Sequence, residues 1–81
     1  MKVAIIGAGN MGGAIARALA ATREYKIALS NPTLPKLEAF KAEFPERFIT
    51  VTTDNVEAVI DADVVILAVK PWLLGQVIDQ I

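Results

Sequence analysis

The sequence predicts an α/β domain in which a parallel sheet is covered by helices on both faces. Short apolar runs typical of buried strands alternate with stretches whose apolar residues recur at helical spacing. Repeated units of this kind give parallel strands, because each helix carries the chain back to the end of the sheet where the previous strand began. A glycine-rich turn, G-A-G-N-M-G-G at Gly7 to Gly13, joins the first apolar run to the first helical stretch.

Four short apolar runs are the predicted strands. The first and the last are almost continuously apolar, which is typical of strands that are buried on both faces of a sheet. We expect the strands near Lys2 to Ile6, Lys26 to Leu29, Phe48 to Val51 and Val64 to Val69.

The first helix is expected between the first two strands, from about Asn10 to Thr22. Ile15 and Leu19 lie one helical turn apart. Ala14 and Ala18 are small, so the helix and the sheet can approach each other closely.

The second helix is expected to begin at Thr33 or Leu34, because Pro35 is tolerated in a first turn. Pro45 ends it, since proline cannot continue a helix. The apolar face of this helix carries Leu37, Phe40 and Phe44.

Two shorter helices complete the predicted elements. Asp54 followed by Glu57 resembles a capping box that would open a helix through Ile60. Pro71 suits the first turn of a final helix. The apolar residues of that helix follow the i, i+3, i+4, i+7 rule and are Leu74, Val77, Ile78 and Ile81.

The length of the chain indicates one incomplete domain over residues 1–81. Its 81 residues fall short of the roughly 100 to 200 that are typical of a domain. A chain this small buries only about 60% of its unfolded surface, so we expect marginal stability unless a partner covers the exposed sheet edge and the last helix. The hydrophobic content of 54% fits elements that are covered on both sides, and a homo-oligomer is expected.

Composition excludes several classes of function. The net charge of −1 gives no general attraction for nucleic acid or anionic membranes, so we predict neither as a partner. The chain has no cysteine and no histidine, so no disulfide, no thiolate site and no other metal site is predicted. No apolar stretch approaches the roughly 18 residues that span a bilayer. The amino terminus enters a strand without a signal-peptide pattern, so we expect a cytoplasmic protein.

The glycine-rich turn is typical of a dinucleotide-binding site. Gly7 can take the tight turn out of the strand, Gly9 lets the backbone approach a pyrophosphate, and Gly12 lets the helix pack against the strand. The helix start offers unpaired N–H groups and the positive end of its dipole to phosphates. We therefore predict a Rossmann-type fold, of which this chain supplies the amino-terminal part.

The residues after the second strand favour NADP(H) over NAD(H), although some sites accept both. NAD sites usually place an acid here to bind the ribose 2′-hydroxyl, yet no acid occurs between Glu24 and Glu38. The side chains that could donate hydrogen bonds or charge to a 2′-phosphate are Ser30, Asn31, Thr33 and Lys36. The alternative is that residues 30–33 only turn the chain and cap a helix.

The fourth strand is expected beside the first, across the point where the strand order reverses. The backbone of Ala68, Val69 and Lys70 would then line the cofactor near its pyrophosphate and nicotinamide ribose. The Lys70 side chain contacts a phosphate or ribose in one interpretation and is a solvated charge in the other.

Three further residues have divided or structural interpretations. Asn55 either approaches the adenosine side of the cofactor or belongs only to a helix start. Trp72 and Tyr25 are expected to be packing residues.

Four segments together resemble pyrroline-5-carboxylate reductase. They are I-I-G-A-G-N-M-G-G-A-I-A, S-N-P-T, D-N-V-E-A-V and D-V-V-I-L-A-V-K-P-W, and they span essentially the whole chain. The glycine segment is shared with many dehydrogenases, but G-N-M-G joined to a later A-V-K-P is more specific. The resemblance implies reduction of the cyclic imine acid 1-pyrroline-5-carboxylate to L-proline with NAD(P)H.

By position, the resemblance implies cofactor contacts along the glycine turn, after the second and third strands, and at the end of the fourth. These contacts fall on Ile6, Gly7, Ala8, Gly9, Asn10 and Met11, on Asn31, on Asn55, and on Ala68, Val69, Lys70 and Pro71. In that family a helical carboxyl-terminal domain dimerises and supplies most of the substrate pocket. Nothing in the 81 residues corresponds to it, so we assign no catalytic residue and expect no turnover by this chain alone.

Two alternative functions stay open from the sequence. One is another NADP-dependent reductase, of the β-hydroxyacid dehydrogenase or deazaflavin-linked type, with the same amino-terminal half. The other is a non-catalytic module that senses NADP(H).

Overall fold

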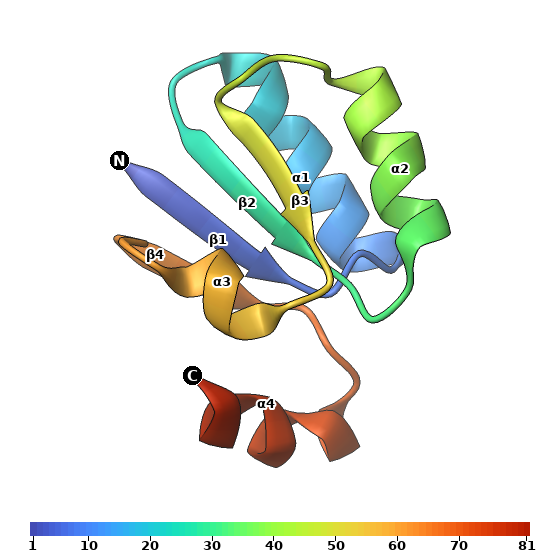
Figure 1. Cartoon of the computed structure of the whole chain (residues 1–81), viewed down its shortest axis with the longest axis vertical. Helices are drawn as coiled ribbons and strands as arrows, with labels where there is room; N and C mark the ends of the chain where they lie inside the picture. Colours follow the sequence, from blue (N-terminus) through green and yellow to red (C-terminus); the bar gives the residue numbers. More distant parts are fainter.

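Four parallel strands form one sheet in the order β3-β2-β1-β4 (Figure 1). The computed structural model describes residues 1–81. The strands are β1 (Lys2–Ile6), β2 (Lys26–Ser30), β3 (Ile49–Thr52) and β4 (Val64–Leu67). This order confirms the Rossmann-type prediction, because β4 pairs with β1 on the side away from β2.

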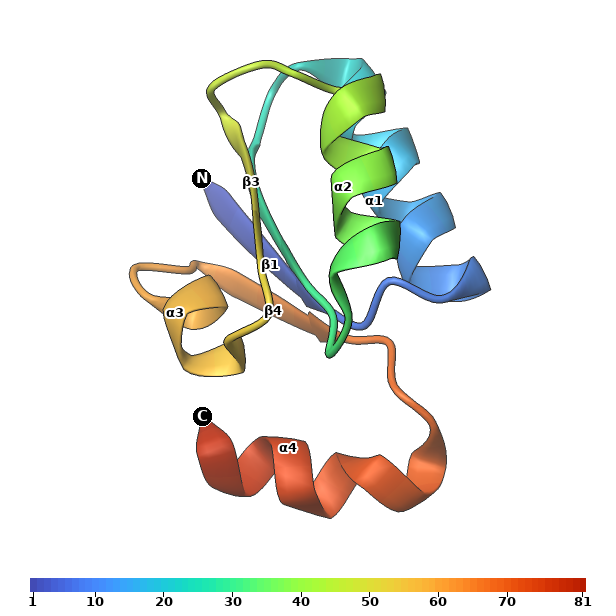
Figure 2. The same cartoon turned by 45° about the vertical axis from the view of Figure 1, so that its right-hand side comes forward.

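Helices cover both faces of the sheet, as predicted. α1 (Asn10–Thr22) and α2 (Leu34–Glu43) lie on one face, while α3 (Asn55–Val59) and α4 (Leu74–Gln80) lie on the other (Figure 2). A single turn of 3₁₀ helix, Pro71–Leu73, leads into α4. Because the strands are parallel, the loops that follow β1, β2, β3 and β4 lie together at the carboxyl-terminal end of the sheet.

The larger hydrophobic core lies between the sheet and the α1–α2 layer. Its buried members come from β1, β2, β3 and both helices, and they are Val3, Ile5, Ala16, Ala20, Ile27, Leu29, Leu37, Phe40 and Ile49. The face of α1 that meets the sheet consists of the small residues Gly12, Gly13, Ala16 and Ala20, whereas Ala14 and Ala18, expected there, are exposed. The glycine turn is therefore held against a well-packed layer.

The core on the α3–α4 face is smaller and consists of Ile6, Ala28, Ala58 and Val77. Asp54 caps α3, since its side chain accepts hydrogen bonds from the N–H groups of Val56 and Glu57. The predicted capping box is only half formed. The Asp54 N–H donates to Thr52 Oγ1 at 3.0 Å, which takes the place of the predicted Glu57 carboxylate.

The outer strand and the last helix are exposed, in line with the expectation of an uncovered sheet edge and last helix. β4 ends at Leu67, and Val64 and Val65 are 40% and 39% exposed, because β4 has only β1 as a neighbour. Trp72, expected to pack, is 77% exposed, whereas Tyr25 packs against the larger core as expected. Of the predicted apolar face of α4, only Val77 is buried.

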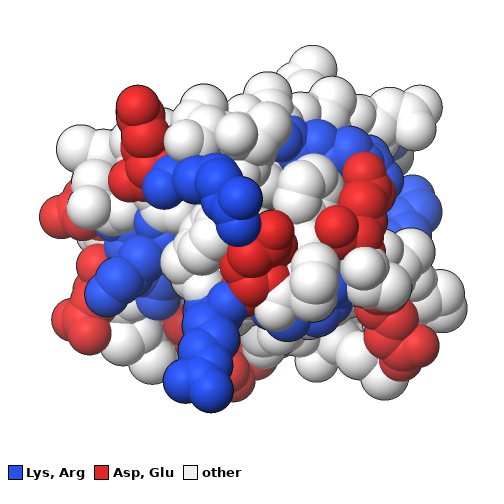
Figure 3. All heavy atoms as spheres, turned by 90° about the horizontal axis from the view of Figure 1, so that it is seen from above, with Lys and Arg blue, Asp and Glu red and all other residues white.

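Charged side chains of both signs are interspersed on the end of the molecule opposite α4 (Figure 3). That face therefore carries no extended field of one sign. No helix of the chain has both the length and the hydropathy required to cross a bilayer.

Candidate functional site

The glycine turn after β1 is a backbone arrangement that side chains would obstruct. Gly7 has φ +106°, a conformation that L residues rarely adopt, and its N–H donates to the Ser30 carbonyl at 2.8 Å. A Cβ at Gly7 would overlap the Ala68 carbonyl oxygen, and a Cβ at Gly12 would overlap the Gly7 carbonyl oxygen. The turn, the start of α1 and the segment after β4 are thus in backbone contact.

Gly9 leaves open the space above this turn. A Cβ built at Gly9 would meet no atom within 4 Å, so the glycine is not required by packing within the chain. Gly9 is also the N-cap residue of α1, and no side chain caps the helix there. The first N–H groups of α1 therefore lack side-chain acceptors, and such groups bind phosphate oxygens well.

The loop after β2 is fastened to the glycine turn by Asn31. Its Oδ1 accepts a hydrogen bond from the Ala8 N–H at 3.1 Å, and its Nδ2 donates to the carbonyl and hydroxyl oxygens of Thr33 at 3.2 and 3.1 Å. The Thr33 hydroxyl keeps its own hydrogen for another acceptor, and Thr33 is exposed. This arrangement leaves Thr33 able to contact a phosphate.

Ser30 has a structural position instead of the predicted contact with a 2′-phosphate. Its side chain is 0% exposed, and its Oγ donates to Asn55 Oδ1 at 2.7 Å. The hydrogen of the Ser30 hydroxyl is used in this bond inside the protein, and the side chain does not reach the surface. The signal that the sequence could have given is its place at the end of a strand covered on both faces.

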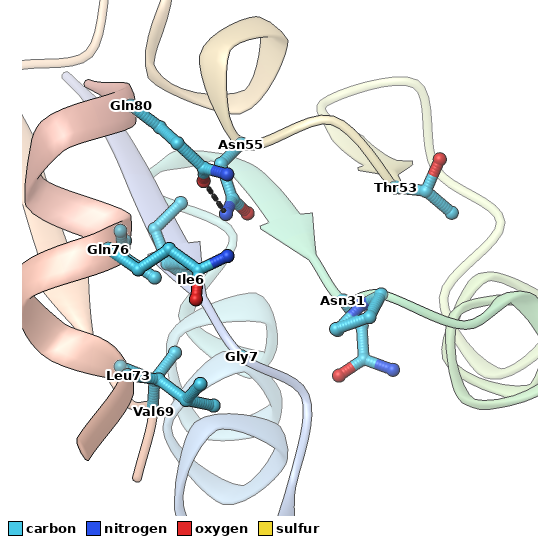
Figure 4. A pocket seen from close by; sticks show the side chains of 11 residues that line it. Ile6, Gly7, Asn31, Thr53, Asn55, Val69, Leu73, Gln76 and Gln80 are labelled. Atoms are coloured by element: carbon cyan, nitrogen blue, oxygen red, sulfur yellow. Dashed lines mark hydrogen bonds between the residues drawn. The ribbon is translucent and has the colours of Figure 1, made fainter. Parts of the chain in front are cut away.

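One cavity, of about 250 Å³, lies at the carboxyl ends of the strands against α4 (Figure 4). Five residues predicted for the cofactor line it, and they are Ile6, Gly7, Asn31, Asn55 and Val69. Gln76 and Gln80 from α4 also line it, and neither was predicted from the sequence. The Asn55 Nδ2 donates to Gln80 Oε1 at 2.8 Å, which joins α3 to α4 at the rim. The i, i+4 spacing of the two glutamines was the available signal.

A second cavity, of about 280 Å³, lies on the α1–α2 side of the glycine turn. Of the predicted residues, Ala8, Gly9, Asn10 and Lys36 line it, together with Leu29, Ala39, Phe40 and the unpredicted Arg17.

Neither cavity is lined by a carboxylate. No group of three or more His, Cys, Asp or Glu residues is placed to hold a metal ion. The arrangement is suited to binding an anionic, partly apolar ligand.

The remaining predicted residues lie around the turn without lining either cavity. Ala68 lies against the start of the glycine turn, because the Ala68 N–H donates a hydrogen bond to the Ile6 carbonyl at 2.8 Å. Met11 is 71% exposed at the start of α1. Lys70 and Pro71 are exposed where the chain leaves β4 for the 3₁₀ turn.

Comparisons with known proteins find similarity along nearly the whole chain. Pyrroline-5-carboxylate reductase 2 of Dictyostelium discoideum is 38% identical over 83 residues, which cover 99% of this chain and 27% of that protein. The Vibrio alginolyticus pyrroline-5-carboxylate reductase is 42% identical over 77 residues, covering 94% of this chain and 28% of that protein. Pyrroline-5-carboxylate reductase 3 of Danio rerio is 34% identical over 84 residues, covering 100% and 28%.

The chain spans roughly a quarter of the length of these three relatives. A match to a protein family extends over nearly all of it, from residue 2 to residue 81. The chain therefore belongs to the family described as NADP oxidoreductase coenzyme F420-dependent, a family of oxidoreductases, and it carries a Rossmann-type domain.

Proposed function

We propose that this chain is the cofactor-binding domain of an NADPH-dependent pyrroline-5-carboxylate reductase, which reduces 1-pyrroline-5-carboxylate to L-proline. The observation that carries the cofactor assignment is the contact of Gly7 with Gly12 and Ala68, which leaves bare backbone at the point where the strand order reverses. The names of the relatives support the substrate assignment.

The residues present fit a dinucleotide. The N–H groups that follow Gly9 would hold the pyrophosphate, because a Cβ-sized space there is open and no side chain caps the helix. The cavity against α4 has apolar walls from Val69 and Leu73 and amide groups at its rim, which suits an uncharged part of the cofactor. At about 250 Å³ it lies below the roughly 300 to 1,000 Å³ of cavities that take whole drug-sized ligands, so it holds part of a larger molecule.

The preference for NADPH is supported by the charges around the loop after β2. No carboxylate lies directly after β2, where it could bind a ribose 2′-hydroxyl. Instead, Lys36 lines the second cavity, and Thr33, three residues earlier in the chain, is exposed. A carboxylate would repel a 2′-phosphate, and a lysine attracts it.

The chemistry of the reaction belongs to the cofactor. When bound, NADPH supplies a hydride to the carbon of the imine, and the nitrogen takes up a proton. The backbone around Gly7 and Ala68 orients the cofactor, and the walls of the cavity exclude water from its apolar parts. We assign no catalytic side chain within residues 1–81, and we place the opposite wall of the substrate pocket elsewhere in a longer protein.

We also propose that this chain forms a homo-oligomer. The supporting observation is the apolar surface on the outer strand and last helix, where Val64, Val65 and Ile78 are 39 to 56% exposed. Burial of such residues is favourable in proportion to the apolar area removed from water.

The binding half of the proposal is tested by calorimetric titration of the purified chain with NADPH and with NADH. We expect NADPH to bind more tightly. Tighter binding of NADH would contradict the cofactor preference, and no binding of either would contradict the domain assignment. Proline formation by the 81-residue chain alone would contradict the absence of turnover.

The family description favours a second candidate, a reductase that exchanges hydride between NADP and a deazaflavin coenzyme. The full-length protein distinguishes the two. We expect oxidation of NADPH with 1-pyrroline-5-carboxylate and formation of proline. NADP reduction by the reduced deazaflavin, with no proline formed from the imine, would favour the second candidate.

A further inference from the structure

We propose that Arg17 is a phosphate-binding residue, which together with Lys36 forms the site for the 2′-phosphate of the nucleotide and sets the preference for it. The inference rests on the proposed function, because it takes NADPH as the ligand of the glycine turn. The two cations come from different helices, Arg17 from α1 and Lys36 from α2, and both line the second cavity.

The second cavity has the charge expected of a site for a dianion. Its walls carry two cationic side chains and no carboxylate, and the glycine turn at Ala8, Gly9 and Asn10 forms one side of it. A nucleotide lying along the turn would therefore pass the mouth of this cavity. A phosphate on its adenosine ribose would meet two cationic side chains there, of which Arg17 is also paired with Glu43.

The absence of a side chain at Gly13 makes room for the Arg17 guanidinium. A Cβ at Gly13 would lie 3.3 Å from Arg17 Nη1, tighter than ordinary van der Waals contact. Helical side chains point back towards the amino end of their helix, so Arg17 folds over the turn of α1 that contains Gly13. The guanidinium is thereby brought close to the glycine turn, although Arg17 is two turns into α1.

Glu43 holds one edge of the guanidinium and leaves the rest free. Arg17 Nε lies 3.1 Å from Glu43 Oε2 and 3.3 Å from Oε1, whereas neither terminal nitrogen donates a hydrogen bond within the chain. The Arg17 and Glu43 side chains are 51% and 47% exposed. An ion pair this exposed to solvent contributes little to stability. Its effect is to orient a planar group whose remaining N–H donors suit a phosphate.

The chain contains a matched control for this assignment. Arg23, at the other end of α1, also pairs with a glutamate, Glu46, at 3.5 Å, and it lines neither cavity. Arg23→Ala therefore removes the same charge and a comparable surface ion pair without touching the proposed site. A general loss of positive charge would affect both arginine variants alike.

The test is calorimetric titration of the wild-type chain and its variants with NADPH and with NADH at low ionic strength. We expect Arg17→Ala to weaken NADPH binding by about tenfold or more, as for loss of a charged hydrogen bond, and to change NADH binding by less than about twofold. Arg17→Lys should recover part of the NADPH affinity, because it restores the charge but not the planar donor set. Arg23→Ala should leave both affinities unchanged.

Gly13→Ala provides a second test that does not depend on the Arg17 variants being folded. Alanine favours a helix, so this variant should be at least as stable as the wild type, while its Cβ requires the guanidinium to shift by a few tenths of an ångström. We expect a smaller loss of NADPH affinity than in Arg17→Ala, with NADH affinity unchanged.

Three results would overturn the assignment. They are an unchanged NADPH affinity in Arg17→Ala, an equal loss of NADPH and NADH binding, and the same effect from Arg23→Ala. In each of these the wild type still binds NADPH, and the proposed function stands. Failure of the wild type to bind either nucleotide would instead refute the proposed function itself.

Discussion

Replacing Gly12 with alanine should separate α1 from the sheet. The added Cβ would lie 2.9 Å from the Gly7 carbonyl carbon and 3.1 Å from Ala68 Cβ, and it would overlap the Gly7 carbonyl oxygen. Ordinary contacts of a Cβ begin at 3.4 Å, and the overlapped atoms belong to the backbone, so no side-chain rotation relieves the clash. Either the first turn of α1 or the glycine turn has to move.

The cost of this movement is a large part of the total stability. Overpacking a well-packed core typically costs about 1 to 3 kcal/mol, and a clash with backbone places Gly12→Ala at the upper end. An 81-residue domain has a free energy of unfolding of roughly 4 to 12 kcal/mol. For a urea slope of about 1.5 kcal/mol per molar, a loss of about 3 kcal/mol lowers the unfolding midpoint by about 2 M.

Urea unfolding followed by circular dichroism measures this loss, with Gly9→Ala as the matched control. A Cβ at Gly9 meets nothing within 4 Å, so the cost is only that of alanine as a poorer N-cap, no more than about 1 kcal/mol. The same Cβ would occupy the space proposed for the pyrophosphate, so Gly9→Ala should weaken NADPH binding while staying folded. Equal midpoints for Gly12→Ala and the wild type would refute the packing argument, and unimpaired NADPH binding by Gly9→Ala would refute the phosphate site.

Substitutions at three other positions give predictions of both signs. Gly75→Ala should raise the melting temperature by about 4 °C, because it adds up to about 1 kcal/mol of helix propensity where nothing lies within 4 Å; a lower melting temperature would contradict this. Asp54→Ala should cost about 1 kcal/mol in urea unfolding by removing the cap of α3, and Asp54→Asn should restore most of it. Ser30→Ala should cost about 1 kcal/mol through the lost bond to Asn55 and affect NADPH and NADH binding equally in titrations. A loss confined to NADPH would instead show that Ser30 binds the phosphate.

Local sequence patterns predicted the elements that depend on near neighbours. β1 and α1 lie at the predicted residues, since an apolar run, a glycine turn and a helical repeat all agree there. Pro35 lies in the first turn of α2, as expected. The expectation for Trp72 was wrong because burial depends on what lies across the sheet, which no local pattern reports.

The candidate site was predictable where backbone conformation determines it. At Gly7 and Gly12 a Cβ would overlap a backbone carbonyl oxygen, so only glycine fits. The residue type in the sequence therefore indicates this constraint directly. Side-chain roles were harder to predict. Ser30 has a hydroxyl suited to a phosphate, but its burial and its bond to Asn55 follow from α3 crossing over the end of β2.

The sequence by itself determined the order of strands and helices and the place of the bare glycine turn, because apolar spacing and residue size act over a few neighbouring positions. Only the tertiary structure decided that Arg17 and Lys36 share a cavity and that Gln80 reaches Asn55. The physical reason is that these contacts join segments 19 or more residues apart, whose meeting depends on how helices pack across the sheet. The sequence pattern around a charged residue of a helix is the same whether its side chain faces water or a cavity. Only the packing of the helices distinguishes these two positions.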